Sequence, residues 1–75
     1  MAAHDRQIAE RLRAARAATG LSQEALAHAA GISRNHLQAL ERGVGGQANP
    51  RLSTLYALAG ALGVKVVRLL PDDAS

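Results

Sequence analysis

Two consecutive segments that each begin with serine and end with glycine constrain this chain more than any other feature. The first covers residues 22–31 and the second covers residues 33–43. Serine is a preferred N-cap of an α-helix, and glycine commonly follows the last residue of one. The spacing therefore predicts two short helices, over residues 23–30 and 34–42, joined by a tight turn at Gly31.

The apolar residues of this stretch indicate how the two helices pack. They recur at a spacing that would lock the helices together at a steep angle. They are Leu26, Ala30, Ile32, Leu37 and Leu40. Ala27 lies four residues before Gly31, where a larger side chain would push the helices apart. The outward side of the second helix then carries Arg34, Asn35, Gln38, Ala39 and Arg42.

The rest of the chain predicts two more helices and one ambiguous segment. Residues 6–18 have the pattern of a first helix, with Asp5 as its N-cap. Residues 44–49 contain two adjacent glycines and predict a loop. A fourth helix follows to residue 62, with Asn49 as N-cap and the proline after it as the first helical residue. Residues 64–70 fit either a short helix or a β-strand, because three valines in four residues favour a strand.

Length and composition favour one all-helical domain. A chain of 75 residues has room for a single core, which we expect over residues 6–70, between tails at residues 1–5 and 71–75. Seventeen residues are Ala and eleven are Leu, both strong helix formers, and Tyr56 is the only aromatic residue. A β-sandwich would need many more β-branched and aromatic residues. The predicted fold is a compact all-α bundle, with five helices if residues 64–70 are helical.

Composition also limits the function. The chain has no Cys, and His4, His28 and His36 lack the spacing of a metal site, so we expect no metal and no cofactor. The sequence contains no nucleophile–base pairing and no phosphate-binding loop that would indicate an enzyme. No apolar run approaches the ~20 residues needed to cross a bilayer, so we expect a cytoplasmic location. The net charge of +3, with Arg at eight of nine basic positions, favours a polyanionic partner.

Several short stretches, taken in order, resemble the Cro and phage-repressor (Xre-type) helix-turn-helix family. They are LRAAR ending at Arg16, GLSQEALA at residues 20–27, GISRNHLQALERG at residues 31–43, NP at residues 49–50 and ALGV at residues 61–64. The resemblance extends from Ile8 to Leu70, and the spacing between Gly20 and Gly43 matches the family without insertion. It implies a repressor-like DNA-binding domain whose recognition helix, residues 34–42, enters the major groove.

The resemblance also implies roles for particular residues. The base readers would be Arg34, Asn35, Gln38 and Ala39. Arg matches guanine, Asn matches adenine, and an Ala methyl group can touch thymine. The phosphate contacts would be Ser22, Gln23, Ser33, Arg42 and Arg51. Gln23 would also brace the recognition helix, and Arg16 and Glu41 would form an internal salt bridge between the first and third helices.

The implied function is a sequence-specific transcriptional regulator that binds double-stranded DNA and is associated with the nucleoid. An antitoxin that binds both operator DNA and a toxin protein is the alternative. We expect a homodimer on a palindromic site, formed through the fourth helix and residues 64–70, because the apolar residues there exceed what a small bundle buries. Leu69 and Leu70 keep the family pattern and favour a helix in that segment. Lys65, however, replaces the usual serine cap, and some antitoxin-like relatives have a strand there.

Overall fold

The computed structural model describes residues 2–43 and 50–70, which form four α-helices and one 3₁₀ helix with their connections. They are α1 (Ala2–Thr19), α2 (Gln23–Ala30), α3 (Arg34–Arg42), α4 (Leu52–Leu62) and η2 (Val66–Arg68). These residues include no β-strand, so the all-α prediction is confirmed, with a 3₁₀ helix in place of a fifth α-helix. The predicted loop at residues 44–49, the N-cap at Asn49 and the tail at residues 71–75 lie outside the described residues.

Helices α2 and α3 have the predicted bounds because local interactions define both of their ends. The side chains of Ser22 and Ser33 each accept a hydrogen bond from the backbone amide three residues later, at 3.0 Å. After the helices, Gly31 and Gly43 take left-handed backbone conformations, with φ of 74° and 65°. This conformation costs other residues about 1–2 kcal/mol. The caps and the glycines therefore begin and end both helices without help from the rest of the fold.

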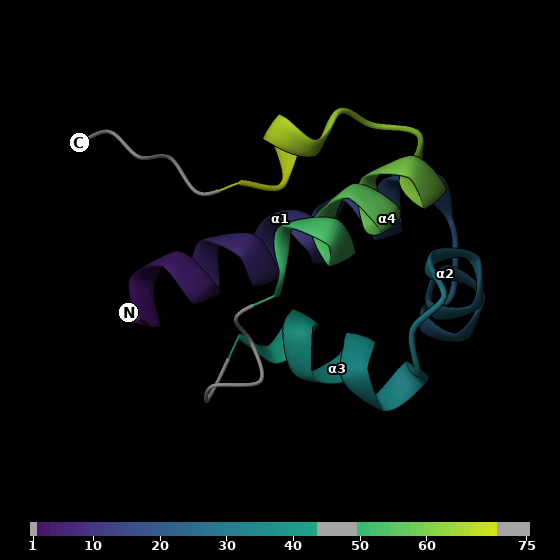
Figure 1. Cartoon of the computed structure of the whole chain (residues 1–75), viewed down its shortest axis with the longest axis horizontal. Helices are drawn as coiled ribbons and strands as arrows, with labels where there is room; N and C mark the ends of the chain where they lie inside the picture. The colour runs from purple at the N-terminus through teal and green to yellow at the C-terminus, as the bar shows by residue number, and fades with distance from the viewer. Residues whose placement is uncertain (1, 44–49, 71–75) are drawn as a thin grey trace.

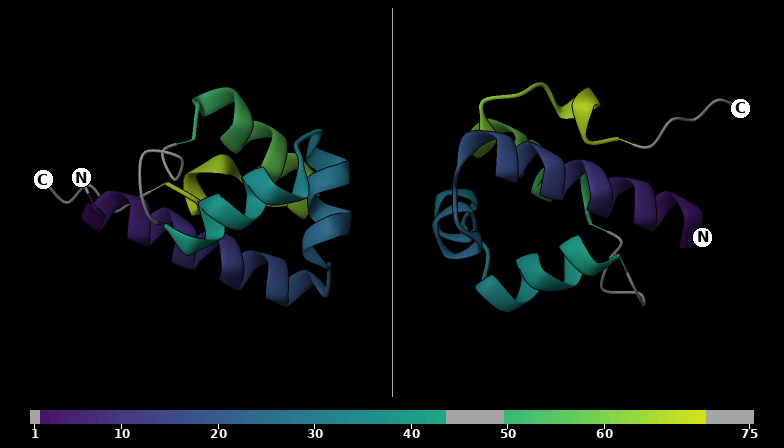
Figure 2. Two further views of the ribbon diagram at one scale, coloured as in Figure 1. Left: turned by 90° about the horizontal axis from the view of Figure 1, so that it is seen from below. Right: turned by 180° about the vertical axis from the view of Figure 1, so that it is seen from behind.

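The helices pack in two main pairs, α1 against α3 and α2 against α4. In Figure 1, α2 is seen end-on while α3 runs across the view, so the two helices meet at a steep angle. Figure 1 and the right-hand view of Figure 2 show that η2 and α3 lie on opposite sides of the molecule. Among the described residues, no helix covers the side of α3 that carries Arg34, Asn35 and Arg42, which are exposed.

Leucine side chains from all four helices and from the residue after η2 form the core. Those fully buried are Leu12, Leu26, Leu37, Leu40, Leu58 and Leu69. Burying one such side chain contributes about 1.5–3 kcal/mol relative to leaving it in water. Ala27 is only 2% exposed and belongs to the same cluster. Its small side chain lets α2 approach its neighbours closely.

Two predicted helix starts are wrong. Helix α1 begins at Ala2, so Asp5 lies inside the helix and is not its N-cap. Two alanines at residues 2 and 3 are strong helix formers and extend the first turn beyond the predicted start. Helix α4 begins at Leu52, two residues after Pro50, because Arg51 has an extended backbone with φ −71° and ψ 155°. The proline ring sets φ near −65°, a value that extended chain and helix share.

The strand alternative for residues 64–70 is also wrong. Backbone amides in this segment donate to carbonyls three residues earlier, from Arg68 to Lys65 at 2.9 Å and from Leu69 to Val66 at 2.9 Å. A strand needs a neighbouring strand to satisfy its backbone groups, and the part of the chain that the structure describes offers none. The valines therefore lie in a short 3₁₀ helix.

Most of the apolar residues on α4 face the core, but the first one does not. Leu55, Leu58, Ala59 and Leu62 are buried, whereas Leu52 is 57% exposed. Helical spacing identifies the residues that share a face of a helix. It does not say how far along that helix the core extends. The first turn of α4 projects beyond the core.

Candidate nucleic-acid interface

The uncovered side of α3 carries the predicted base-reading residues. Arg34 and Asn35 are exposed in the first turn, directly after the Ser33 cap. Gln38 and Ala39 follow one turn later and are half-buried. Because residues four apart lie on the same face of a helix, these side chains form one continuous surface. This surface consists of a cationic group, two amides and a methyl group.

The N-terminus of α2 lies beside this surface. Ser22 is exposed, and its hydroxyl oxygen serves as the N-cap while its O–H can donate outward. Gln23 is half-buried and contacts α3 through two hydrogen bonds. Its Nε2 donates to Glu41 Oε1 at 3.0 Å, and its Oε1 accepts from Gln38 Nε2 at 3.4 Å. The first residue of α2 is thus attached to both the middle and the end of α3.

Two open hollows flank Gln23. One, of about 360 Å³, is lined by Arg13, Gln23, Gln38, Glu41 and Arg42. The other, of about 320 Å³, is lined by Arg16, Ser22, Gln23, Glu24 and Arg34. The first hollow presents two guanidinium groups, two amides and the Glu41 carboxylate, and the second presents two guanidinium groups, an amide, a hydroxyl group and the Glu24 carboxylate. Guanidinium, amide and hydroxyl groups are the donors that phosphate oxygens accept from in protein–DNA complexes.

A buried ion pair joins α1 to α3 beneath the surface. Arg16 Nε lies 2.6 Å from Glu41 Oε2, and Arg16 Nη2 lies 3.0 Å from Glu41 Oε1. The Glu41 side chain is 3% exposed and the Arg16 side chain 22%. The hydrogen bond to Glu41 raises the pKa of Arg16 above its usual value, with a further contribution from the charge of Glu41 and against the effect of burial. Arg16 Nη1 also donates to the Leu21 carbonyl at 3.0 Å.

Sequence reasoning missed Arg13. Its Nη1 donates to the backbone carbonyl of Glu41, 28 residues away, and its side chain lines the first hollow together with Arg42. A cation near the C-terminal carbonyls of a helix stabilises that helix through its dipole. No local pattern in the sequence marks this role, because it depends on how α1 packs on α3.

Arg51 is exposed at the N-cap position of α4 and lines neither hollow. Two further predicted phosphate contacts lie at the ends of α3. Ser33 is its exposed N-cap. Arg42 is exposed in its last turn and lines the first hollow. The predicted phosphate contacts Ser22, Gln23 and Arg42 are thus adjacent to the α3 surface, and Arg51 lies apart from both hollows.

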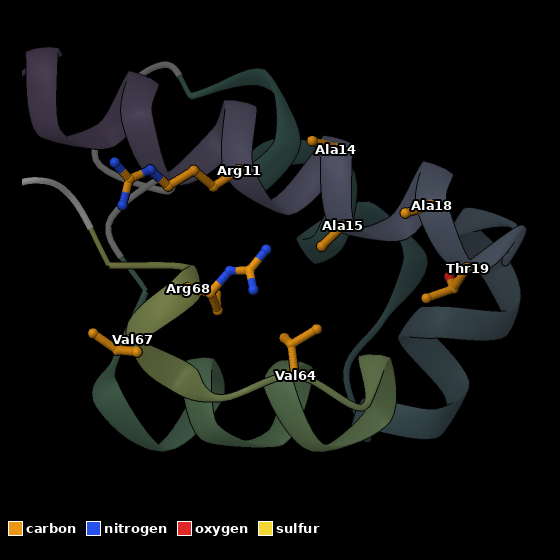
Figure 3. A pocket seen from close by; sticks show the side chains of 8 residues that line it. All are labelled: Arg11, Ala14, Ala15, Ala18, Thr19, Val64, Val67 and Arg68. Atoms are coloured by element: carbon orange, nitrogen blue, oxygen red, sulfur yellow. The ribbon is translucent and has the colours of Figure 1, made fainter.

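A larger hollow of about 620 Å³ lies between α1 and the C-terminal segment (Figure 3). Its lining consists of Arg11, Ala14, Ala15, Ala18, Thr19, Val64, Val67 and Arg68. None of these residues was predicted to contact DNA. Arg11 Nη1 donates to the Leu70 carbonyl and so connects α1 to this segment.

Within residues 2–43 and 50–70, no helix combines the length and the apolarity needed to span a membrane. In the same part of the chain, no three His, Asp or Glu side chains gather where they could hold a metal ion. His28 and His36 are exposed on different helices.

Comparisons with known proteins agree with this geometry. The family model described as Helix-turn-helix matches residues 12–69. The immunity repressor protein of Bacillus phage phi105 is 39% identical over 66 residues, which are 88% of this chain and 44% of the repressor. An uncharacterized HTH-type transcriptional regulator of Sinorhizobium fredii is 47% identical over 55 residues, 72% of this chain and 68% of that protein. This chain thus spans less than half of the phage repressor's length.

A solved structure gives the same result. The restriction-modification controller protein C.AhdI from Aeromonas hydrophila superposes with a TM-score of 0.81 at 38% identity, over 88% of this chain and 96% of that one. The family match begins within α1 and includes α2, α3, α4 and η2. The chain belongs to the helix-turn-helix family, of the Cro and phage-repressor (Xre) type.

Proposed function

We propose that this chain is a sequence-specific transcriptional regulator that binds double-stranded DNA and reads the major groove with α3. The observation that carries the proposal is the exposed start of α3. Arg34 and Asn35 project from a helix whose far end is held to α1 and α2 by the buried Glu41. A rigid helix with exposed Arg and Asn in its first turn has the features of a major-groove reader.

In the proposed complex, one set of residues contacts the bases and another set contacts the phosphates. Arg34 and Asn35 would form bidentate hydrogen bonds to guanine and adenine, and Ala39 would contact a thymine methyl group. The two hollows beside Gln23 would receive phosphates of the DNA backbone, and Ser22 and Arg42 would donate to these phosphates. Ser33 and Arg51, which line neither hollow, would contact other phosphates. This assignment adds Arg13 to the phosphate contacts, because it lines the first hollow. The role is one of binding, without catalysis, on the nucleoid in the cytoplasm.

The proposed assembly is a homodimer formed through α4 and the C-terminal segment, with two recognition helices on a palindromic site. Most of α4 is already used in the core of a single chain. Among the described residues, the large apolar side chains left exposed are Leu52, Tyr56 and Val67, at 57%, 59% and 60%. All three belong to α4 or η2, which supports an interface on these elements. A dimer doubles the base contacts and places its recognition helices about one DNA turn, ~34 Å, apart.

Selection of binding sites from random duplex DNA tests the function. The wild-type protein should enrich one sequence, and its affinity should fall steeply with salt, by about 0.9 in log–log slope for each phosphate neutralised. Arg34→Ala and Asn35→Ala should each lose about 1–3 kcal/mol on the enriched sequence and retain their affinity for random DNA.

Arg6→Ala is the matched control for charge. Arg6 is exposed on α1, lines neither hollow beside Gln23 and belongs to neither α4 nor the C-terminal segment, so its removal changes the net charge and leaves the proposed DNA contacts and the proposed dimer interface intact. It should leave sequence preference unchanged. An Arg34→Ala variant that loses specific and random binding equally would refute base reading by Arg34. A wild-type protein that enriches no sequence would refute the proposed function.

A further inference from the structure

We propose that the buried carboxylate of Glu41 orients the side-chain amide of Gln38 by way of Gln23, and that this orientation makes Gln38 a reader of adenine. The inference rests on the proposed function and extends it to a particular base. Three side chains from two helices form the relay. Gln23 and Gln38 are 15 residues apart in the sequence and meet only through the packing of α2 against α3.

The first link is determined by the chemistry of Glu41. A carboxylate that is paired with a guanidinium accepts hydrogen bonds and donates none, and Glu41 accepts two hydrogen bonds from Arg16. Gln23 Nε2 lies 3.0 Å from Glu41 Oε1 and donates to it. A flipped Gln23 amide would bring its oxygen against an oxygen of the buried Glu41 carboxylate, with no hydrogen between them. Two buried acceptors in contact are strongly unfavourable, so the nitrogen of Gln23 faces Glu41.

The second link follows from the first. With its nitrogen on Glu41, Gln23 turns its Oε1 toward Gln38, whose Nε2 lies 3.4 Å away. That oxygen needs a donor, so Gln38 presents its nitrogen inward. The Oε1 of Gln38 and its second N–H are then available on the outer side. Gln38 is half-buried on the α3 surface, one turn after the exposed Arg34, so this outer edge lies on the side of α3 where we place the bases.

An amide with an acceptor and a donor side by side matches one base edge in the major groove. Adenine offers the N6 amino group as a donor and N7 as an acceptor, and glutamine can bind both at once. Guanine offers two acceptors, O6 and N7, so one of them would face the Gln38 oxygen. A freely rotating amide could rearrange at an entropic cost, whereas the relay holds one arrangement before DNA arrives.

The test compares sequences selected by the wild-type protein with those selected by Gln38→Met and Gln23→Met. Methionine keeps the unbranched shape of glutamine and removes its amide. Gln38→Met should abolish the preference at one base pair of the enriched site, and in the wild-type site that base should be adenine, favoured by roughly 5- to 150-fold. Gln23→Met should lower the same preference by a similar factor, although Gln38 itself is unchanged. Combining the two changes should produce little further loss of preference.

Arg42→Ala is the control, because Arg42 lines the same hollow as Gln38 but takes no part in the relay. It should weaken binding to all sequences without changing the preference at that base pair. A second measurement needs no DNA: in the free protein, Gln23→Met should shift the NMR signals of the Gln38 side-chain amide, while Arg51→Ala, at a residue that lines neither hollow, should leave them in place.

Two results would overturn the relay and leave the proposed function standing. One is an adenine preference that Gln23→Met does not reduce. The other is a base other than adenine at the position that responds to Gln38→Met. A wild-type selection that enriches no sequence at all would instead refute the proposed function, and the relay with it.

Discussion

Removing Arg16 should destabilise this protein more than removing its partner Glu41. The reason is the unequal burial of the two side chains, 3% exposed for Glu41 and 22% for Arg16. In Arg16→Met the carboxylate stays buried with Gln23 Nε2 as its remaining side-chain donor. In Glu41→Leu the guanidinium keeps its hydrogen bond to the Leu21 carbonyl and can reach water. The uncompensated charge is therefore costlier in the first variant.

The expected magnitudes follow from this difference. Leaving a buried charge without its partner costs about 3–5 kcal/mol, which we assign to Arg16→Met. Glu41→Leu should cost about 1–3 kcal/mol, the penalty for hydrogen-bond donors that lose an acceptor but remain near solvent. A domain of this size has a total stability of about 4–11 kcal/mol at 0.05–0.15 kcal/mol per residue. Arg16→Met should thus lower Tm by on the order of 20 °C.

Urea denaturation and thermal melting, followed by circular dichroism, measure the free energy of unfolding of both variants and of the double variant. The double variant should be more stable than the two single losses added together predict, because an apolar pair replaces the ion pair. Arg68→Met removes an exposed arginine and should change stability by less than about 0.5 kcal/mol. A Tm for Arg16→Met equal to that of Arg68→Met, or a larger loss in Glu41→Leu, would refute the reasoning.

Three further predictions concern the helix ends and the exposed apolar surface. Ser33→Ala removes the side-chain cap of α3 and should cost about 1 kcal/mol in urea denaturation, with Ser33→Asp close to wild type. Gly31→Ala should cost about 1–2 kcal/mol of unfolding free energy, and this cost comes from the φ of +74° alone because a Cβ there meets no atom within 4 Å. Gly31→Asn should cost less, because Asn tolerates the left-handed conformation better than Ala. Equal losses in the two variants would show that the backbone conformation is not the cause. If the dimer forms through α4, Tyr56→Lys should shift sedimentation at micromolar concentration toward the monomer while the melting of the monomer stays near wild type; an unchanged sedimentation profile would remove Tyr56 from the interface.

The sequence predicted best those features whose causes are local. The bounds of α2 and α3 agree with prediction because each helix has its own serine cap and its own left-handed glycine. The outward position of Arg34 and Asn35 follows from the same helix bounds and from the apolar residues on the opposite face. The start of α4 is not determined by local sequence, because Asn49 and Pro50 suit both a helix start and an extended segment before a helix.

Features that depend on contacts between residues far apart in the sequence could not be predicted from local sequence patterns. Leu52 shares the spacing of the buried leucines of α4 but lies beyond the end of the core. The valines of residues 64–67 suit a strand, yet the described residues include no strand to pair with them. Arg13 finds its acceptor on α3, and Arg11 finds one at Leu70, 59 residues away. Intrinsic propensity carries no information about such partners.

The same distinction between local and tertiary causes applies to the candidate site. Sequence by itself determined that α3 is a short capped helix with Arg, Asn and Gln on one side, because these properties follow from residues within a few positions of one another. Only the tertiary structure decided which way the amides of Gln23 and Gln38 point, and which arginines gather beside them. Their orientation depends on a buried carboxylate at the far end of α3 and on a guanidinium from α1. Hydrogen bonds between side chains on different helices exist only after the helices have packed.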